Sequence, residues 1–275
     1  MDDLLTYPCR FMAGDSLDII RIVSWNIRAG GGRRIQEIDR QLSCWNADVV
    51  VLSEFRGTPA SDWLGKELGK KELSYQLSTV DPQFPARNRL LIASRWPLQN
   101  IESSLAPTEP GRWIMAHIQA PLAFKIGAMH IPNYVTGRKY QFHDAVLSLA
   151  TQWLNEPAIL IGDTNTGRIG LDEEVPVFSY REEKWMVGLE TAGWHDGYRY
   201  MHGNKPAYTW YSPNGRNGFR LDEAFIHRSL IPRLHDTYYA WSSHTNDPLR
   251  RDAVSDHAAV IVELMTPAFP ANSKS

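Results

Sequence analysis

The sequence predicts an α/β protein in which mixed β-sheets lie in layers with helices on the outside. Short apolar runs rich in β-branched residues recur along the 275 residues, and stretches with helical spacing separate only some of them. Strands without a helix between them pair mostly antiparallel, whereas parallel strands need a crossover, so we expect both arrangements together. The length fits one large domain covering residues 1–275, with a core at about residues 19–264.

The chain opens with a predicted strand–helix–strand unit. Residues 19–25 are a short β-branched run, and a turn-like glycine stretch follows at 29–32. Residues 48–54 return to the pattern of a buried strand. Between these strands, four apolar side chains share one helical face: Ile35, Ile38, Leu42 and Trp45.

Most of the other predicted elements are strands, and one long helix interrupts them. The helix covers about residues 138–154 and turns Phe142, Val146, Leu149 and Trp153 inward. A polar stretch at 167–184 is expected to be a loop or a short helix, and the tail after Pro267 to be loose. The strands are expected at 89–94, 113–119, 124–129, 158–162, 208–211, 221–227 and 257–264.

Composition excludes several classes of protein. A net charge of −2 and a pI near 6.5 argue against coating nucleic acid by bulk charge, so any phosphate-binding surface must be local. The two cysteines, Cys9 and Cys44, give no disulfide framework and no zinc-ligand spacing. The first residues carry two acids where a signal peptide needs positive charge, and the apolar runs are too short to span a membrane. We therefore expect a cytoplasmic protein.

Polar residues recur at the points where apolar strands end. Carboxylates, amides and imidazoles that converge on one rim are what a hard cation and a phosphate require. These residues are Asn26, Glu54, His130, Asp163 and Asn165, completed by Asp222, Asp256 and His257.

Taken singly, most of these residues have a simpler interpretation. Asn26 and Asn165 alone would more often be turn or cap residues, and a glycine before Asp163 would usually mark a tight turn. Glu54 is different, because a carboxylate at the end of a buried strand needs a partner or a cation. His257 alone would more often be structural, but with Asp222 it becomes a base with an orienting carboxylate. The remaining histidines are assigned to structure or surface.

Six motifs in order along the chain make the sequence resemble the endonuclease/exonuclease/phosphatase superfamily over roughly residues 19–264. That superfamily includes abasic-site nucleases, deoxyribonuclease I, deadenylases, sphingomyelinases and inositol polyphosphate phosphatases. The resemblance implies a four-layered α/β sandwich, with two central mixed sheets flanked by helices and the site at one edge of the sheets. The motifs are SWNIR, VVVLSEFR, HIPN, IGDTN, RLDEAFIH and SDH.

The resemblance also implies a role for each residue. Glu54 would hold Mg²⁺, for which Mn²⁺ could substitute, with support from Asn26 and Asp256. Asp163 would position or deprotonate the attacking water, and Asn165 would steady that water or a phosphate oxygen. His257, oriented by Asp222, would contact the scissile phosphate. His130 would donate a proton to the leaving oxygen, so that the products are a free hydroxyl and a phosphate end.

One departure from the family pattern is Arg28, where many abasic-site nucleases carry an aspartate that joins the outer shell of the metal. With Arg33 and Arg34 across the glycines, Arg28 is better suited to gripping a substrate phosphate, because guanidinium offers a planar fork of donors. The alternative is a solvated loop. The glycines are not a P-loop, since no Gly-Lys-Ser/Thr follows them.

Three functions remain open from the sequence. A nuclease acting on DNA or RNA is favoured by Asn133 in HIPN and by arginines near the motifs, namely Arg28, Arg87, Arg89, Arg216 and Arg220. Trp210, Phe219 and Leu221 match positions that line the damaged-sugar pocket of abasic-site nucleases, although ordinary core packing is the alternative. The second function is hydrolysis of a small-molecule or lipid-headgroup phosphoester, and the third is a non-catalytic binding domain. We expect a monomer with no obligate protein partner and no membrane contact.

Overall fold

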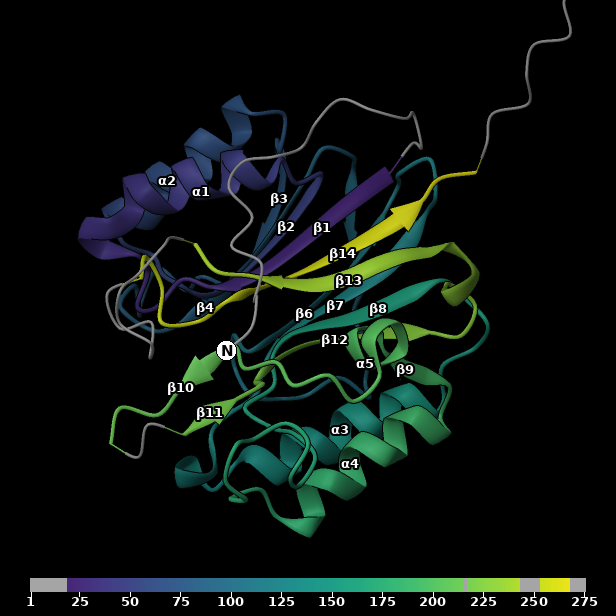
Figure 1. The fold of residues 1–275 in the computed structure, drawn as a ribbon. Coiled ribbons are helices and arrows are strands. Elements are labelled where there is room, and N and C mark those ends of the chain that lie inside the picture. The colour runs from purple at the N-terminus through teal and green to yellow at the C-terminus, as the bar shows by residue number, and fades with distance from the viewer. Residues whose placement is uncertain (1–18, 215–216, 243–252, 268–275) are drawn as a thin grey trace, which may run out of the picture.

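Two six-stranded mixed sheets lie face to face between helices in the computed structural model (Figure 1). The structure describes residues 19–214, 217–242 and 253–267. Cys9, Arg216 and the tail after Pro267, for which the sequence gives expectations, lie outside the described residues.

The first sheet contains both ends of the described chain. Its strands β1 and β2 run parallel, and its other neighbours pair antiparallel. The order across the sheet is β13 (Leu234–Ala240), β14 (Ala259–Met265), β1 (Ile19–Asn26), β2 (Val49–Phe55), β4 (Arg89–Ser94) and β3 (Tyr75–Ser78).

The second sheet is built from the middle of the chain. Here β7 and β8 run parallel and the other pairs are antiparallel. The order is β5 (Leu98–Asn100), β6 (Trp113–Ile118), β7 (Phe124–His130), β8 (Ala158–Asp163), β12 (Asp222–His227) and β9 (Trp194–Asp196).

Two helices cover the outer face of each sheet (Figure 1). On the first sheet these are α1 (Ile35–Trp45) and α2 (Pro59–Lys70), and on the second α3 (Lys139–Thr151) and α4 (Tyr180–Thr191). Smaller elements complete the chain: α5 (Gly197–His202), the hairpin β10 (Trp210–Tyr211) and β11 (Gly218–Phe219), and the 3₁₀ turns η1 (Gly32–Arg34), η2 (Tyr134–Thr136) and η3 (Ile231–Arg233).

Three apolar layers hold these elements together. The central layer packs alternate side chains of both sheets against each other, including Ile22 and Val51 of the first sheet and Ile126 and Ile159 of the second. The outer layers join each sheet to its own helices. Burial on both faces explains why the central strands are almost continuously apolar. The predicted four-layered α/β sandwich is confirmed.

The predicted elements match the structure except where polar residues obscure the pattern. The long predicted helix is α3, but it ends at Thr151, so Trp153 lies beyond it rather than on its inner face. All four apolar residues of the first predicted helix are buried in α1. The stretch at 167–184 is a loop up to Ser179, where a capping box with Glu182 starts the 12-residue helix α4. The Ser-x-x-Glu pattern of that box is visible in the sequence and would have placed the start of α4. The elements not predicted from the sequence are α2, β3, β5, β9, α5, β11 and β13.

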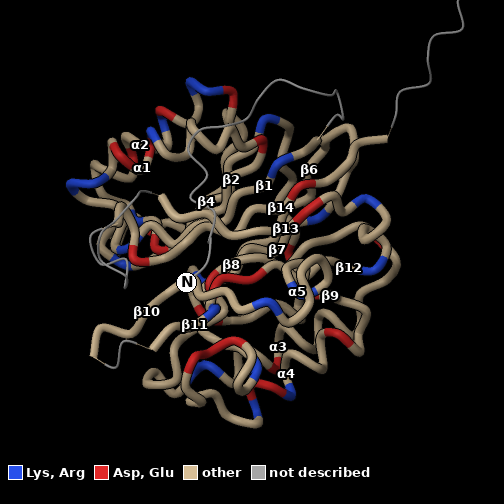
Figure 2. Tube along the Cα trace, viewed as in Figure 1, with Lys and Arg blue, Asp and Glu red and all other residues tan. Residues whose placement is uncertain are grey.

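Acidic and basic residues are interspersed over the molecule, as expected from the nearly balanced charge (Figure 2). A substrate phosphate must therefore be held by a local group of cations. Among the described residues, no helix combines the length and the apolar character needed to cross a membrane.

Candidate active site

The polar strand-end residues lie at one edge of the two sheets. In the second sheet, Asp163 is the register partner of His130 on β7 and of Asp222 on β12, so three motif residues stand side by side. In the first sheet, Asn26 ends β1 beside the end of β2, and His257 precedes β14, the antiparallel neighbour of β1. The convergence expected from the sequence is therefore present.

A hydrogen bond between buried side chains joins the edges of the two sheets. Asn26 Nδ2 donates to Asp163 Oδ2 at 2.9 Å, and Asn26 Oδ1 accepts the Arg28 N–H at 2.9 Å. Ser255 Oγ donates to the carbonyl of Asn26 at 2.6 Å, which ties the segment before His257 to the same place. Asn26 therefore fixes Asp163 directly.

Backbone geometry at Gly162 allows Asp163 to reach this edge. Gly162 has a φ of +147°, and a Cβ atom there would lie 1.9 Å from the Met129 carbonyl oxygen. Only glycine permits β7 and β8 to approach this closely just before Asp163. The Gly-Asp pair is thus part of a strand rather than the isolated tight turn that it would usually indicate.

Glu54 is turned out of its strand by a local irregularity. The register between β2 and β4 shifts between Ser53 and Phe55, and Glu54 itself has a φ of +57°. A non-glycine residue in this region is strained, and such strain is concentrated at functional sites. The loop at 29–32 holds the carboxylate, because the Ala29 N–H donates to Glu54 Oε2 at 2.6 Å.

His257 and Asp222 form the expected imidazole–carboxylate pair. His257 Nδ1 lies 2.8 Å from Asp222 Oδ2, and both side chains are buried. Burial alone would favour the neutral ring, but Asp222, and next Asp163, outweigh it and raise the pKa of His257 to about 10. The ring is therefore positively charged at neutral pH.

His130 has the opposite charge state. Its Nε2 lies 3.6 Å from Asp163 Oδ2, but burial, together with Arg112 and His257, lowers the pKa of His130 to about 4. Burial also raises the pKa of Asp163. His130 is therefore neutral at pH 7 and is poorly prepared to act as the proton donor that the resemblance implied.

Asn165 completes the group around Asp163. Its backbone N–H donates to Asp163 Oδ1 at 3.0 Å, and its side chain donates to the Ile131 carbonyl at 3.0 Å. Asn165 adopts a φ of +48°, a left-handed conformation that asparagine tolerates better than most residues. Both oxygens of Asp163 are thus held by amide donors.

The residues proposed for a cation fit a hard divalent ion. Glu54, Asn26 and Asp256 offer oxygen atoms, and Asp256 Oδ1 is buried without a hydrogen-bond partner among the described residues. Ligand atoms of Asp163, Asp222 and His257 also lie within 4.8 Å of one another. In that group the imidazole of His257 is already paired with Asp222, whereas Asp256 has a carboxylate oxygen without a partner among the described residues.

The arginines near the motifs have different environments. Arg28 is 54% exposed, with its Nε 3.8 Å from Asp256 Oδ2, and Arg33 is also exposed. Arg34 instead donates to the Arg28, Ile27 and Val254 carbonyls, so it serves the scaffold rather than the substrate.

Two arginines proposed to bind phosphate are buried instead. Arg89 donates to the Pro110 carbonyl, and Arg220 is surrounded by carboxylates. The prediction that these two line a phosphate surface is wrong, because distant segments supply their partners. Arg87 remains exposed and stacks over the ring of Phe84, with 4.0 Å between its Cζ and the ring centroid.

The aromatic residues expected to bind the substrate lie beside the pair formed by His257 and Asp222. The Trp210 ring centroid is 6.3 Å from that of His257 and 6.0 Å from that of Phe219. Phe219 is 8% exposed and packs against Phe178, so it supports Trp210 from behind. Asn133 is exposed just beyond His130 and is the N-cap residue of η2.

Arg112 is a residue of this site that was not predicted from the sequence. Its Nη1 donates to the His130 carbonyl at 3.1 Å, and Asp163 and Glu54 both act electrostatically on its guanidinium. The available signal was its position immediately before the strand at 113–119. A strand beginning at the same edge as β12 places such a residue on the rim.

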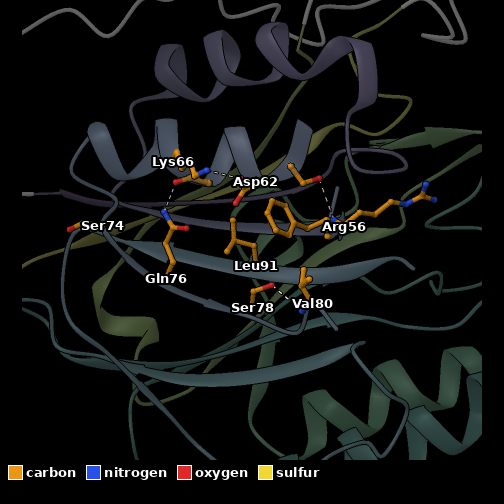
Figure 3. Close-up of a pocket in the computed structure, with 12 residues that line it drawn as sticks. Arg56, Asp62, Lys66, Ser74, Gln76, Ser78, Val80 and Leu91 are labelled. Carbon is orange, nitrogen blue, oxygen red and sulfur yellow. Dashed lines mark hydrogen bonds and ion pairs between the residues drawn. The ribbon is translucent and has the colours of Figure 1, made fainter. Parts of the chain in front are cut away.

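Cavities alone would not have located this edge. A cavity of about 490 Å³ lies under α2, where Arg56, Gln76 and Leu91 contribute to its walls (Figure 3). Another of about 750 Å³ lies between α3 and α4. The buried, hydrogen-bonded carboxylates and imidazoles at the edge of the sheets supply the chemistry that these cavities lack.

Comparisons with known proteins concern the family and the fold of the chain. The model of the Endonuclease/Exonuclease/phosphatase family matches residues 23–257. A 3'-5' exonuclease (NExo) from Neisseria meningitidis superposes with a TM-score of 0.70 at 19% identity, covering 90% of this chain and 100% of the other. The 3' phosphatase NExo from Neisseria bound to product DNA hairpin gives 0.69 at 19% identity, with 89% and 99% covered.

A third structure is an AP endonuclease from Archaeoglobus fulgidus. It has a TM-score of 0.69 at 18% identity and covers 88% of this chain and 98% of its own. At such identities the likeness concerns the fold. No curated protein sequence matches this chain.

Proposed function

Because the chain belongs to the Endonuclease/Exonuclease/phosphatase family, we propose that it is a magnesium-dependent hydrolase that cleaves phosphodiester bonds of DNA or RNA. The observation that carries the proposal is the hydrogen bond between Asn26 and Asp163, beside the pair of His257 and Asp222. It brings carboxylates and imidazoles from both sheets to one edge. These groups match the charges that develop when a phosphoester is cleaved.

Asp163 and His257 perform the proton transfers in this proposal. Asp163 accepts a proton from the attacking water as the water oxygen bonds to phosphorus, and Asn165 holds Asp163 in place. The bond between phosphorus and the leaving oxygen breaks, and that oxygen takes up a proton. Of the two histidines, His257 is the one protonated at neutral pH, so we assign the proton to it, and His130 becomes a neutral hydrogen-bonding group.

Glu54, with Asp256 and Asn26, would hold the cation. When bound, Mg²⁺ or Mn²⁺ supplies charge stabilisation at the non-bridging and leaving oxygens, a contribution of several kcal/mol. Arg28, Arg33 and Arg112 would grip phosphate groups, with Asn133 and Trp210 contacting the adjoining sugar or base.

We favour nucleic acid as the substrate because the similar structures are named as an exonuclease, a 3' phosphatase bound to a DNA hairpin and an AP endonuclease. The second candidate is a phosphatase or phosphodiesterase for small phosphoesters, which the 3' phosphatase name also supports. A single domain acting as a monomer in the cytoplasm stays a prediction, which gel filtration and cell fractionation test.

A substrate panel separates the candidates. Plasmid, single-stranded DNA, RNA, an abasic duplex and bis-p-nitrophenyl phosphate are each incubated with Mg²⁺ or EDTA. We expect cleavage of a polymer, and we expect EDTA to abolish it. Asp163→Ala should lower the cleavage rate about 10²–10⁴-fold. Asp62→Ala, on the exposed face of α2, should leave the rate unchanged. Hydrolysis of the small ester alone would favour the second candidate, and no hydrolysis of any substrate would contradict both.

A further inference from the structure

We propose that Tyr239, backed by a buried cluster around Arg220, is a positioning residue for the Asp222–His257 pair. The proposal rests on the proposed function, because it concerns how that pair is held ready for phosphoester cleavage. The proposed chemistry does not use any group of this cluster. The hydrogen bonds that lead out of the cluster nevertheless end on the backbone of β12, the strand that begins with Asp222.

The cluster is a group of charged side chains with almost no access to water. Arg220 is 0% exposed and lies 2.7 Å from Asp172, 2.6 Å from Asp196 and 3.1 Å from Glu223. Arg199 adds a second guanidinium, 2.5 Å from Asp172. The members come from the 167–179 loop, from β9, from α5, and from residues 220–223, which lead into β12, so four segments meet behind the site.

Tyr239 connects this cluster to Asp222. Its hydroxyl accepts a hydrogen bond from Arg220 Nη1 at 3.2 Å and donates one to the Asp222 carbonyl at 2.9 Å. The hydroxyl is thus fixed from one side by a buried, fully paired guanidinium, and it fixes Asp222 on the other. Asp222 in turn holds His257.

A second connection reaches Asp163. Thr164 Oγ1 donates to Glu223 Oε2 at 2.9 Å and its backbone N–H donates to the Leu221 carbonyl at 2.7 Å. Thr164 and Glu223 follow Asp163 and Asp222 directly in the chain. The residue behind each catalytic carboxylate is therefore bonded to the residue behind the other, which sets the spacing between the two carboxylates.

Charge balance lets the cluster exist in the interior. Burial raises the pKa of Glu223 well above its ordinary range. For Asp172 burial is outweighed by Arg220 and Arg199, and its pKa falls to about 2. Two guanidinium groups thus face the carboxyl groups of Asp172, Asp196 and Glu223. Buried ion pairs give little net stability compared with apolar packing, so a role in fixing geometry is the better account of their presence.

Tyr239→Phe is the informative variant, because removing Arg220 would leave buried carboxylates unpaired and unfold the protein. The matched control is Tyr238→Phe. Tyr238 is the preceding residue of β13 and donates its hydroxyl to Glu263 Oε1 at 3.1 Å, away from the site. Each variant loses one tyrosine hydroxyl from the same strand.

The experiment measures kcat and KM on the best substrate of the panel, the unfolding temperature, and the downfield proton resonance of His257 Nδ1–H in the resting protein. We expect Tyr239→Phe to lower kcat about 5–20-fold with KM within about twofold, since small misplacements of catalytic groups cost up to about 10²-fold. The resonance should shift or broaden. Tyr238→Phe should change neither kcat nor the resonance, and the two variants should lose a similar amount of thermal stability.

An unchanged resonance in Tyr239→Phe, or equal kcat in the two variants, would overturn the proposal. The resonance needs no substrate, so it tests the positioning of His257 even if the panel shows that the chain does not cleave nucleic acid. Failure of the proposed function would instead appear in the wild-type protein as absence of hydrolysis.

Discussion

Glu54 and Asp222 are carboxylates at one edge of the molecule, but their surroundings assign them different tasks. Glu54 is presented by a strained backbone, and its carboxylate accepts the Ala29 N–H at 2.6 Å. Asp222 is committed to His257 at 2.8 Å. Asp222 is already paired with an imidazolium, so it is a weaker ligand for a cation than Glu54. Asp256, the other carboxylate expected to hold the cation with Glu54, has an Oδ1 without a hydrogen-bond partner among the described residues.

We therefore predict that Glu54→Gln weakens Mn²⁺ binding by at least about 100-fold, whereas Asp222→Asn changes it less than about threefold. Isothermal titration with Mn²⁺ measures both, and circular dichroism checks that both variants fold. Both should have little activity, since Glu54→Gln loses a cation ligand and Asp222→Asn loses the carboxylate that holds His257. If Asp222→Asn is the variant that loses Mn²⁺, the cation is held by Asp163, Asp222 and His257 instead.

Arg28 gives a second prediction at the scale of the residue. Its guanidinium is half exposed next to Asp256, and its backbone N–H anchors Asn26. Arg28→Ala keeps the backbone and removes one cation, so KM for a duplex should rise about 5–20-fold and the salt slope should fall by about 0.9. Mn²⁺ affinity should stay the same.

The control for that variant is Arg40→Ala on the exposed face of α1, which should leave KM and the salt slope unchanged. A loss of Mn²⁺ binding in Arg28→Ala would count against a phosphate-gripping role.

At the scale of the element, the site depends on how closely strands approach each other at their ends. β7 and β8 run parallel, and their last register partners are His130 and Asp163. Gly162 lets the two backbones touch just before that point. The antiparallel strand β12 then brings Asp222 beside Asp163. Spacing within the sheets, rather than loop conformation, sets the positions of these three groups.

Gly162→Ala should therefore destabilise the protein strongly. The new Cβ would meet the Met129 carbonyl oxygen at 1.9 Å, so β7 and β8 must separate, which we expect to cost about 3 kcal/mol or more. Gly170→Ala is the control, because Gly170 has a φ of +66° but a Cβ atom there would have nothing within 4 Å. Urea unfolding of both variants separates the effect of the clash from that of the positive φ. Equal losses of stability would show that β7 and β8 can separate without lowering the free energy of unfolding.

At the scale of the whole molecule, buried neutral histidines make folding depend on pH. Burial lowers the pKa of His143 to about 3 and that of His130 to about 4, whereas the unfolded chain has the ordinary value of about 6.5. Below pH 6.5 the unfolded chain binds these protons and the folded chain does not. Stability contributed by each neutral ring is therefore full above pH 6.5 and is lost as the pH falls toward its folded pKa.

We predict that the unfolding free energy falls by about 1.4 kcal/mol per pH unit for each histidine in that window. His143→Phe keeps the ring that stacks 4.4 Å from Trp185 but cannot be protonated. Its unfolding free energy should depend less steeply on pH between about 4 and 6 than that of the wild type, as measured by urea unfolding at several pH values. Parallel curves for the two proteins would contradict the assignment.

The sequence by itself determined the apolar strands and the polar residues that end them. Alternation and β-branched runs report burial directly, so Asn26, Glu54, His130, Asp163, Asp222 and His257 could be placed at strand ends from the sequence. Elements with mixed faces, such as α2 and β13, were missed because exposed and buried residues dilute the pattern in short segments.

Only the tertiary structure decided what each arginine does. Arg28 and Arg220 both belong to motifs, yet one faces solvent and the other is enclosed by Asp172, Asp196 and Glu223. Arg112 reaches the site from a strand that carries none of the motifs. A guanidinium is long and flexible, and its partners come from segments distant in the chain, so its environment is fixed by packing rather than by its neighbours in sequence.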